Sequence, residues 1–340
     1  MRAIIYRQSG ETDVLQLVER PEPTPLAGEV LIKIAVSGVN PTDWKSRRGA
    51  KAGEPLQFDE VVPNQDGSGT IIAVGDGVDP ARIGQRVWIW EAAYRRAGGT
   101  AQEVIALPQA QAVPLPDSAS WELGASLGIP ALTAHRCLTV HEQTKGGLRP
   151  GCLKGLTVLV AGGAGAVGHA AIELATWAGA EVITTVSSSE KEELAAAAGA
   201  HHVVNYRKEN PAKVIRSIAG KGVDIVVEVA PRANATLNQA ILGLNSVVAI
   251  YASDADSLAI PIRPSMGENI RYQFVMVYTV PTAAKYQAVA DVQAALLDGT
   301  LRVGAEAGLP LHRFALEQTA EAHAAVEGFA VGKVLITLDA

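Results

Sequence analysis

The chain has 340 residues, of which 48% are hydrophobic and 19% are charged. At roughly 150 residues per domain, this length predicts about two domains, and the apolar fraction excludes a chain that stays disordered. Lys and Arg number 29 against 35 Asp and Glu, and the net charge of −6, spread without long blocks, argues against a nucleic-acid partner. The two cysteines, Cys137 and Cys152, exclude a four-cysteine zinc site within one chain and favour a reducing compartment.

Short apolar runs separated by Gly and Pro fill the chain up to about residue 115. They cover residues 3–6, 30–39, 70–74, 86–90 and 103–106. Helical periodicity is nearly missing there, so the pattern predicts antiparallel strands that close into a small barrel or a rolled sheet. The first residues resemble a strand rather than an export signal, and no apolar stretch is long enough to span a membrane. We therefore expect a soluble, cytoplasmic protein without a membrane partner.

From residue 157 onward, apolar runs alternate with Ala-rich amphipathic segments. The expected strands are 157–161, 181–186, 203–205, 224–229 and 247–251, and the expected helices are 169–178, 190–198, 211–219 and 234–242. This alternation predicts a parallel sheet with helices on both faces. A sixth strand is expected at 274–278, a long helix at 281–298, and a last strand at 333–338 that returns to the first domain.

A glycine-rich turn joins the first of these strands to its helix. It contains the pattern G-x-G-x-x-G as Gly163, Gly165 and Gly168. Glycine permits a tight turn and lets backbone N–H groups approach a pyrophosphate at the positive end of a helix. The strand before and the helix after favour a dinucleotide site over an ordinary glycine loop.

The end of the second strand determines which dinucleotide is preferred. NAD-binding proteins usually place an acid there, whereas this chain has Ser187, Ser188, Ser189 and then Lys191. Hydroxyls and an ammonium suit a 2′-phosphate, so the sequence predicts NADPH in preference to NADH. Ser189 also fits the N-cap of the next helix, with Glu192 completing a capping box, and both roles are compatible.

With these motifs, the chain resembles the medium-chain dehydrogenase/reductase superfamily and, within it, the zeta-crystallin-like NADPH:quinone oxidoreductases. The segments that carry the resemblance are the glycine turn and residues 38–43, 128–134, 199–206, 222–226 and 332–333. The resemblance implies an α/β fold with a GroES-like β-barrel catalytic domain, residues 1–125 and 281–340. A Rossmann domain, a doubly wound parallel sheet over residues 126–280, is inserted into it. It also implies a homodimer in which the strand at 274–278 extends the sheet across a twofold axis.

The resemblance also implies which residues hold the cofactor. Ser187, Lys191 and Tyr206 match positions that hold the 2′-phosphate, Thr133 a contact to the nicotinamide carboxamide, and Lys333 a position near the cofactor. Phe329 is a departure, because some relatives carry an Arg there for the same phosphate. The full expected set for NADPH is Thr133, Gly162, Gly163, Ala164, Gly165, Ala166, Val167, Gly168, Ser187, Ser188, Lys191, Tyr206, Tyr251 and Lys333.

Zinc is not expected. Where the alcohol dehydrogenases of the superfamily bind zinc through Cys and His, this chain has Asn40 and Gln65, which leaves only Asp66. Amides do not replace a thiolate and an imidazole at a zinc centre. The sequence therefore predicts direct hydride transfer to an activated acceptor, a quinone or an α,β-unsaturated carbonyl.

Two residues are expected to act on the acceptor, on a loop that in the family faces the nicotinamide. Asn40 is assigned as a polar orienting group. Lys45 is assigned to the acceptor carbonyl, where an ammonium stabilises an enolate and delivers a proton if burial lowers its pKa. The alternative is a solvated lysine in the basic run with Arg47 and Arg48, and Asp43 is interpreted as structural.

Other side chains and functions stay open at this point. Aromatic residues near the site are left unassigned, and the histidines, His135 included, show no metal-ligand spacing and are interpreted as structural. An enoyl-thioester reductase would use the same fold and cofactor. An NADPH-sensing or RNA-binding protein with little turnover is an alternative from another class.

Overall fold

The computed structural model describes residues 1–144 and 146–338. The chain forms two compact units, Met1–Ile129 together with Leu311–Ala340, and Pro130–Pro310. The second unit is thus inserted into the first, but its boundary lies at 310 rather than at the expected 280. The reason is helix α8 (Thr282–Leu297), whose Asp291 carboxylate accepts hydrogen bonds from His135 Nε2 and from the Leu148 N–H, both at 2.7 Å.

The first unit contains a seven-stranded sheet, in the order β14-β15-β3-β4-β5-β7, with β6 also paired to β3. Strands β6 and β15 share one edge of β3, because β6 pairs with its first half and β15 with its second half. The elements are β1 (Arg2–Ile5), β2 (Gln16–Glu19), β3 (Glu29–Val39), α1 (Pro41–Arg48), β4 (Asp66–Val74), β5 (Arg86–Ile89), β6 (Val104–Pro108), β7 (Ala112–Pro114), the first half of α2 (Trp121–Leu138), β14 (Leu311–Ala315), α9 (Thr319–Glu327) and β15 (Lys333–Thr337). The GroES-like prediction is confirmed, and the last strand returns to this unit as expected.

Helix α1 was not expected from the sequence. It is short and has no apolar stripe, so periodicity cannot detect it. Pro41 occupies its first position, and the Asp43 carboxylate accepts a hydrogen bond from the Asn40 N–H at 2.7 Å, which fixes the N-terminus. Asp43 and Lys45 therefore lie on a helix and not on a loop.

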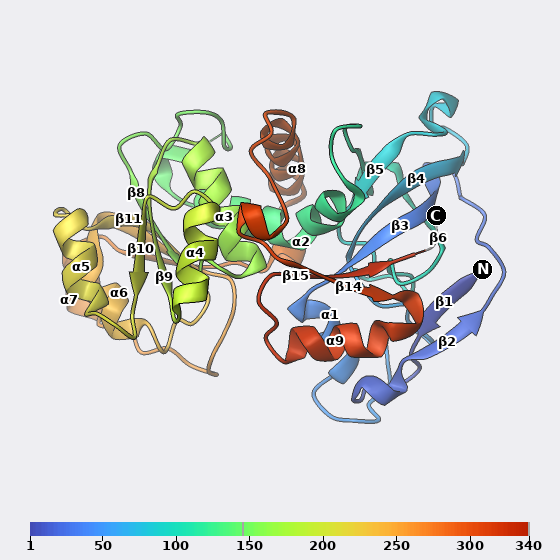
Figure 1. Cartoon of the computed structure of the whole chain (residues 1–340), viewed down its shortest axis with the longest axis horizontal. Helices are drawn as coiled ribbons and strands as arrows, with labels where there is room; N and C mark the ends of the chain where they lie inside the picture. Colours follow the sequence, from blue (N-terminus) through green and yellow to red (C-terminus); the bar gives the residue numbers. More distant parts are fainter. Residues whose placement is uncertain (145, 339–340) are drawn as a thin grey trace. The chain divides into compact units, whose positions relative to one another are not determined.

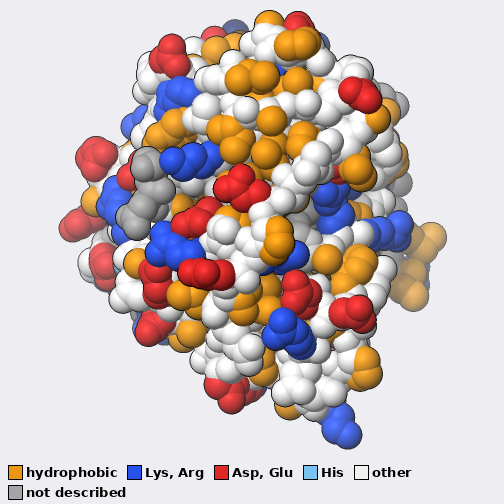
Figure 2. Space-filling view, turned by 90° about the vertical axis from the view of Figure 1, so that its right-hand side faces the viewer, with side chains coloured by type: hydrophobic (Ala, Val, Ile, Leu, Met, Phe, Trp, Pro, Cys, Tyr) orange, Lys and Arg blue, Asp and Glu red, His pale blue; other side chains and the backbone are white. Residues whose placement is uncertain are grey.

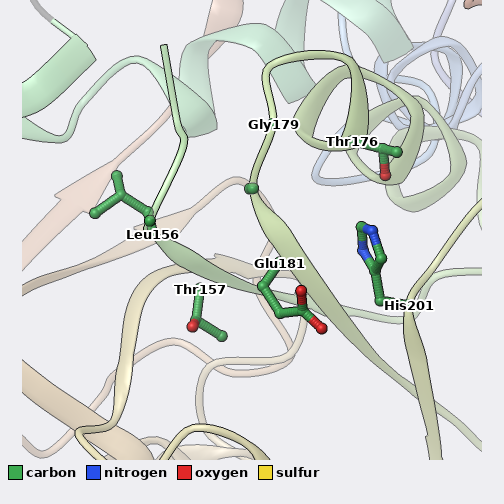
Figure 3. Close-up of a pocket in the computed structure, with 8 residues that line it drawn as sticks. Leu156, Thr157, Thr176, Gly179, Glu181 and His201 are labelled. Atoms are coloured by element: carbon green, nitrogen blue, oxygen red, sulfur yellow. The ribbon is translucent and has the colours of Figure 1, made fainter. Parts of the chain in front are cut away.

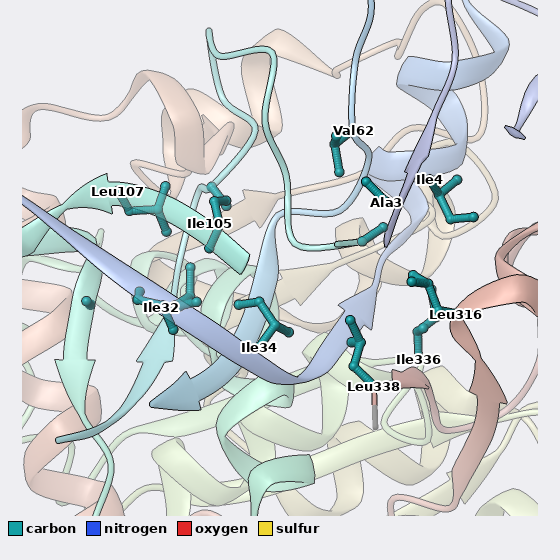
Figure 4. Close-up of a cluster of buried hydrophobic side chains, with 14 of the residues drawn as sticks. Ala3, Ile4, Ile32, Ile34, Val62, Ile105, Leu107, Leu316, Ile336 and Leu338 are labelled. Atoms are coloured by element: carbon teal, nitrogen blue, oxygen red, sulfur yellow. The ribbon is translucent and has the colours of Figure 1, made fainter. Parts of the chain in front are cut away.

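The core of the first unit joins both ends of the chain. Figure 4 shows Ile32 and Ile34 of β3 beside Ile336 of β15 and Leu316, with Ala3 and Ile4 of β1 nearby. Burial of each large aliphatic side chain is favourable by about 1.5–3 kcal/mol. The C-terminal segment is therefore held in the first unit by apolar packing as well as by strand pairing.

The second unit contains a six-stranded parallel sheet in the order β10-β9-β8-β11-β12-β13. Helices α3 and α4 lie on one face, and α5, α6 and α7 on the other (Figure 1). The elements are β8 (Thr157–Ala161), α3 (Ala166–Trp177), β9 (Glu181–Val186), α4 (Ser189–Ala197), β10 (His202–Asn205), α5 (Pro211–Ile218), β11 (Val223–Glu228), α6 (Ala235–Ile241), β12 (Leu242–Ile250), α7 (Ile262–Gly267), β13 (Arg271–Phe274) and α8. The predicted Rossmann fold is confirmed.

The expected sixth strand is displaced. Strand β13 covers Arg271–Phe274 rather than 274–278, because its pairing with β12 runs from Val247–Arg271 to Ile250–Phe274 and β12 ends there. The residues Val277–Thr279 form a turn of 3₁₀ helix instead.

The surface is mixed in charge on the face that Figure 2 shows, where acidic and basic side chains alternate rather than gather by sign. Within the described residues, no helix is both long and apolar enough to cross a lipid bilayer.

Candidate functional site

The carboxyl edge of the parallel sheet carries most of the residues expected to bind the cofactor. The chain starts at β8, moves outward through β9 and β10, and then crosses to β11 on the other side of β8. At such a switch point, ligands bind beyond the carboxyl ends of the strands. Gly162 follows β8, Ser187 follows β9, Tyr206 follows β10 and Tyr251 follows β12.

The glycines of the turn have different neighbours. Gly162 has φ +74°, a conformation that favours glycine. A Cβ at Gly163 would lie 2.2 Å from Thr184 Oγ1, and one at Gly168 would lie 2.3 Å from the Gly162 carbonyl oxygen. A Cβ at Gly165 would meet nothing closer than 3.5 Å. The packing therefore requires Gly163 and Gly168, whereas Gly165 leaves open space before α3, where the first N–H groups of that helix lack intrahelical acceptors.

The end of β9 carries hydroxyl and ammonium groups. Ser188, not Ser189, is the N-cap of α4, and its Oγ accepts from the Lys191 N–H at 3.3 Å. Within the described residues, nothing pairs with the side chains of Ser187 or Lys191. The half-exposed Tyr206 donates its N–H to the Val186 carbonyl at 3.1 Å, which places it beside the end of β9.

Lys208 is a cation that the sequence analysis missed here. Its Nζ lies 2.8 Å from Ser189 Oγ and 3.0 Å from a carboxylate oxygen of Glu192. Its position two residues after Tyr206, behind a strand that ends beside β9, is the signal that could have found it.

Thr133 and Tyr251 are the remaining expected cofactor contacts in this unit. Thr133 is buried in α2. The Tyr251 N–H donates to the Glu228 carbonyl at 3.1 Å. Burial, with Cys137 and Glu228 close by, raises the pKa of the Tyr251 phenol well above its usual value, so this side chain stays neutral.

A polar pocket of about 310 Å³ lies at the opposite edge of the sheet (Figure 3). It opens at the amino ends of β8 and β9 and is lined by Thr157, Thr176, Glu181 and His201 among others. His201 Nδ1 accepts from the Val182 N–H at 3.0 Å, and His202 Nε2 lies 2.7 Å from a carboxylate oxygen of Glu181. Both histidines thus have structural partners, and this pocket is separate from the predicted cofactor residues.

In the first unit, the end of β3 and the starts of β4 and β15 bring Asn40, Asp66 and Lys333 together. The pairing of Gly38 with Asp66 on one side, and of Val39 with Val334 on the other, places the three side chains at one end of adjacent strands. Asn40 Nδ2 donates to Asp66 Oδ2 at 2.7 Å, and Lys333 Nζ donates to Asn40 Oδ1 at 2.7 Å. Lys333 Nζ also lies 3.5 Å from Asp66 Oδ2. All three residues are at most 3% exposed.

Burial dominates the electrostatics of this cluster. Burial and the neighbouring Asp66 raise the pKa of Asp43 to about 8. Burial also raises the pKa of Asp66, opposed by the Lys333 ammonium, the Asn40 amide and the Ile129 N–H. For Lys333, burial lowers the pKa, and the carboxyls of Asp66 and Asp43 oppose that change. A cluster with one cation and two carboxyls thus approaches neutrality by keeping Asp43 protonated.

Two glycines make room for the cluster. A Cβ at Gly38 would lie 2.1 Å from the Ala125 carbonyl oxygen and 3.2 Å from Lys333 Cε. A Cβ at Gly128 would lie 2.1 Å from Asp66 Oδ1, the oxygen that accepts from the Ile129 N–H at 2.8 Å. Both glycines open segments that carried the family resemblance, so the sequence did contain a signal for close packing here.

Gln65 and Lys45 lie apart from these contacts. The Gln65 side chain accepts from the Ala93 N–H at 3.0 Å instead of joining Asn40. Lys45 is exposed, with its Nζ 5.7 Å from the centroid of the Trp44 ring. The burial on which its proposed proton delivery depended is therefore missing, and its contact with an acceptor remains a prediction.

Arg47 is a second buried cation that the sequence analysis placed wrongly in a solvated basic run. It is 0% exposed, and its Nη2 lies 3.1 Å from a carboxylate oxygen of Glu327 on α9. Nearby, burial and Arg47 lower the pKa of His323 to about 3, and His323 Nε2 lies 3.0 Å from Asn64 Oδ1.

The comparisons with known proteins agree with this architecture. Residues 26–117 match the alcohol dehydrogenase GroES-like domain, and residues 166–294 match the family described as zinc-binding dehydrogenase. The human quinone oxidoreductase is 30% identical over 345 residues, which cover 99% of this chain and 98% of that protein.

Two solved structures are also similar. A mycobacterial protein in complex with NADPH has a TM-score of 0.81 at 27% identity, over 99% of this chain and 100% of that chain. An NAD-dependent alcohol dehydrogenase has a TM-score of 0.83 at 27% identity, over 100% of both chains.

The fold and the glycine turn define a dinucleotide-binding oxidoreductase of the medium-chain dehydrogenase/reductase type. Within that superfamily, the chain belongs to the quinone oxidoreductase family. It is therefore an enzyme.

Proposed function

We propose that this protein reduces a quinone or an α,β-unsaturated carbonyl with NADPH, by direct hydride transfer and without zinc. The observation that carries the proposal is the Asn40 amide, held between Lys333 and Asp66 at the position where zinc-dependent relatives place a metal ligand. The human relative's name, quinone oxidoreductase, agrees with the acceptor class.

The cofactor half of the proposal rests on this chain's own residues, because the similar structures include both an NADPH complex and an NAD-dependent enzyme. The open space at Gly165, before the N-terminus of α3, fits a pyrophosphate. Ser187, Lys191 and Tyr206 would hold the 2′-phosphate, since an ammonium and hydroxyls attract it and no acid follows β9 directly. Thr133 and Tyr251 remain predicted contacts, as does Lys333 toward the cofactor.

A zinc ion does not fit the residues at the metal position of the family. The Lys333 ammonium, 2.7 Å from Asn40 Oδ1, would repel a dication. Gln65 points its side-chain oxygen at the Ala93 N–H, and no thiolate or imidazole takes part in the Asn40–Asp66–Lys333 contacts. Elsewhere in the described ranges, no group of three or more His, Cys, Asp or Glu side chains gathers as a metal site needs.

Bound NADPH supplies a hydride. In the acceptor, a C–H bond would form as the C4–H bond of the nicotinamide breaks and NADP⁺ is left. The electron pair of the acceptor double bond would move onto the carbonyl oxygen, which would then take a proton from water. The Asn40 amide orients that oxygen and stabilises its developing charge through an N–H. No metal is needed when the acceptor is already electron-poor.

Oxidation of NADPH in the presence of 1,4-quinones, acyclic enones and enoyl thioesters tests the proposal, with and without prior treatment with a chelator. We expect turnover with a quinone or an enone, unchanged by the chelator. Turnover confined to enoyl thioesters would assign the alternative reductase activity, and loss of activity with the chelator would contradict zinc independence.

The cofactor preference is tested separately with Lys191→Ala, and with Lys213→Ala, an exposed lysine on α5, as the control. Lys191→Ala should raise KM for NADPH and leave KM for NADH unchanged. An equal effect of both variants on both cofactors would contradict the 2′-phosphate assignment.

We also propose that two copies pair through β13. It is the outermost strand of its sheet, and Phe274 and Met276 at its end are 65% and 59% exposed. Such an edge is otherwise open to non-specific pairing. Phe274→Glu should convert a dimer into a monomer in light scattering, whereas Leu26→Glu, an equally exposed site in the first unit, should not.

A further inference from the structure

Lys333 is a buried cation with a specific set of partners. It is 1% exposed, it begins β15, and its ammonium contacts the Asn40 amide and the Asp66 carboxylate. The backbone at Gly38 approaches it so closely that a side chain at that position would press on Lys333 Cε. Burying an ammonium costs free energy even when it is paired, so stability alone does not explain why a lysine lies here.

The Lys333 ammonium determines the orientation of the Asn40 side-chain amide. An ammonium only donates hydrogen bonds and an ionised carboxylate only accepts them, so the amide oxygen must face Lys333 and the amide nitrogen must face Asp66. Asp66 is itself fixed, because its second oxygen accepts from the Ile129 N–H. One N–H of the Asn40 amide remains, and it engages no group in the part of the chain that the structure describes.

We infer that Lys333 is the positioning residue of the acceptor site: its ammonium holds the Asn40 side-chain oxygen toward Lys333, so that Asn40 presents an N–H to the acceptor oxygen. This inference rests on the proposed function and adds a residue and a donor to it. With the amide reversed, the same position would present a lone pair to an oxygen that is gaining negative charge, and the reaction would be slowed.

A paired substitution separates this role from stability. Lys333→Met alone leaves Asp66 buried without its cation and should lower both stability and activity. In Lys333→Met with Asp66→Asn, the new amide keeps its oxygen on the Ile129 N–H and offers an NH₂ to Asn40. The Asn40 amide must then turn over to accept from it. The contact between positions 40 and 66 is then a neutral hydrogen bond again, but the Asn40 amide is reversed and its NH₂ faces the introduced thioether without a good acceptor.

The double variant is therefore expected to be more stable than Lys333→Met alone, and to remain about 10²-fold below the wild type in kcat for quinone reduction, the usual loss for one oxyanion donor. Because Lys333 is also a predicted contact to the cofactor, kcat is compared at saturating NADPH, and the affinity for NADPH is measured separately. Ile71→Ala, in the apolar core of the first unit, is the control for lost stability and should keep its kcat at temperatures where it is folded.

Recovery of activity together with stability in the double variant would overturn the inference and leave the proposed function standing. If the double variant does not fold, Asn40→Ala tests the donor on which the inference depends. It removes the amide and keeps the ion pair of Asp66 with Lys333, and a kcat equal to that of the wild type would overturn the inference. Lack of activity of the wild-type protein on every acceptor would refute the proposed function, and the inference would fall with it.

Discussion

Gly128 lies directly against Asp66, because a Cβ at position 128 would be 2.1 Å from Asp66 Oδ1. In the interior of α2, Ala would normally be preferred to Gly by about 1 kcal/mol. Here the methyl group must displace a buried carboxylate that holds the Ile129 N–H and the Asn40 amide. Gly128→Ala should therefore destabilise the protein by about 1–3 kcal/mol in denaturant unfolding, in the range of overpacked cores.

Gly267→Ala is the matched control. Gly267 is also helical, and a Cβ there would meet nothing within 4 Å. We expect this variant to be neutral or slightly more stable than the wild type. Equal effects of the two substitutions would show that the close approach of Gly128 to Asp66 does not affect the free energy of unfolding.

The glycine turn allows the roles of its glycines to be separated. Gly165→Ala should leave the unfolding midpoint unchanged, because the methyl group meets only the Gly162 carbonyl oxygen at 3.5 Å. It should nevertheless weaken NADPH binding, since it fills the space in which we place the pyrophosphate. Fluorescence titration with NADPH measures the affinity.

Gly163→Ala and Gly168→Ala are expected to do the reverse. Their methyl groups would lie 2.2 Å from Thr184 Oγ1 and 2.3 Å from the Gly162 carbonyl oxygen, so both variants should unfold at lower denaturant concentrations. If Gly165→Ala binds NADPH with the affinity of the wild type, the placement of the pyrophosphate at this turn is wrong.

The second unit was largely predictable from the sequence, whereas the cluster of Asn40, Asp66 and Lys333 in the first unit was not. Strands such as β8 and β9 are continuous apolar runs between helices, so local pattern alone fixes them. Asn40 and Lys333, by contrast, are 293 positions apart and meet only because β15 returns to the edge of β3. No local pattern encodes that pairing.

Burial also depends on tertiary packing. Arg47 and Lys45 lie two positions apart in one basic run, yet the first is fully buried against α9 and the second is exposed. Their sequence context is the same, and only the face of α1 on which each lies separates them. A match to a position of the family can identify such residues, but it does not predict whether their side chains are buried.

His323 should make the protein sensitive to acid. Its pKa is lowered to about 3 by burial and by the facing Arg47. Asn64 Oδ1 only accepts, so the neutral imidazole donates from Nε2. Below a pH of about 6.5, His323 binds a proton in the unfolded chain but not in the folded chain. The contribution of His323 to stability is therefore lost as the pH falls. His323→Gln, which keeps the donor, should be less sensitive between pH 6 and pH 4 in unfolding measurements.

Asp43 should change the stability with pH in the direction opposite to His323. Its pKa is raised from 3.8 to about 8 by burial and by Asp66, with Lys333 opposing the rise and the buried Tyr6 phenol nearby. The folded chain then keeps a proton that the unfolded chain releases above a pH of about 4. Stability from this group is complete below the unfolded pKa and is lost as the pH rises through the folded value, by up to about 1.4 kcal/mol per pH unit.

Asp43→Asn tests this sign, because the amide keeps an oxygen for the Asn40 N–H and does not titrate. Subtracting its unfolding free energies from those of the wild type, between pH 5 and pH 8, should give a difference that falls with rising pH. The slopes of Asp43 and His323 have opposite signs below a pH of about 6.5 and partly cancel there in the wild type. Each must therefore be measured in the single variant. A flat difference curve for Asp43→Asn would mean that Asp43 is ionised in the folded protein and that the cluster carries a net negative charge.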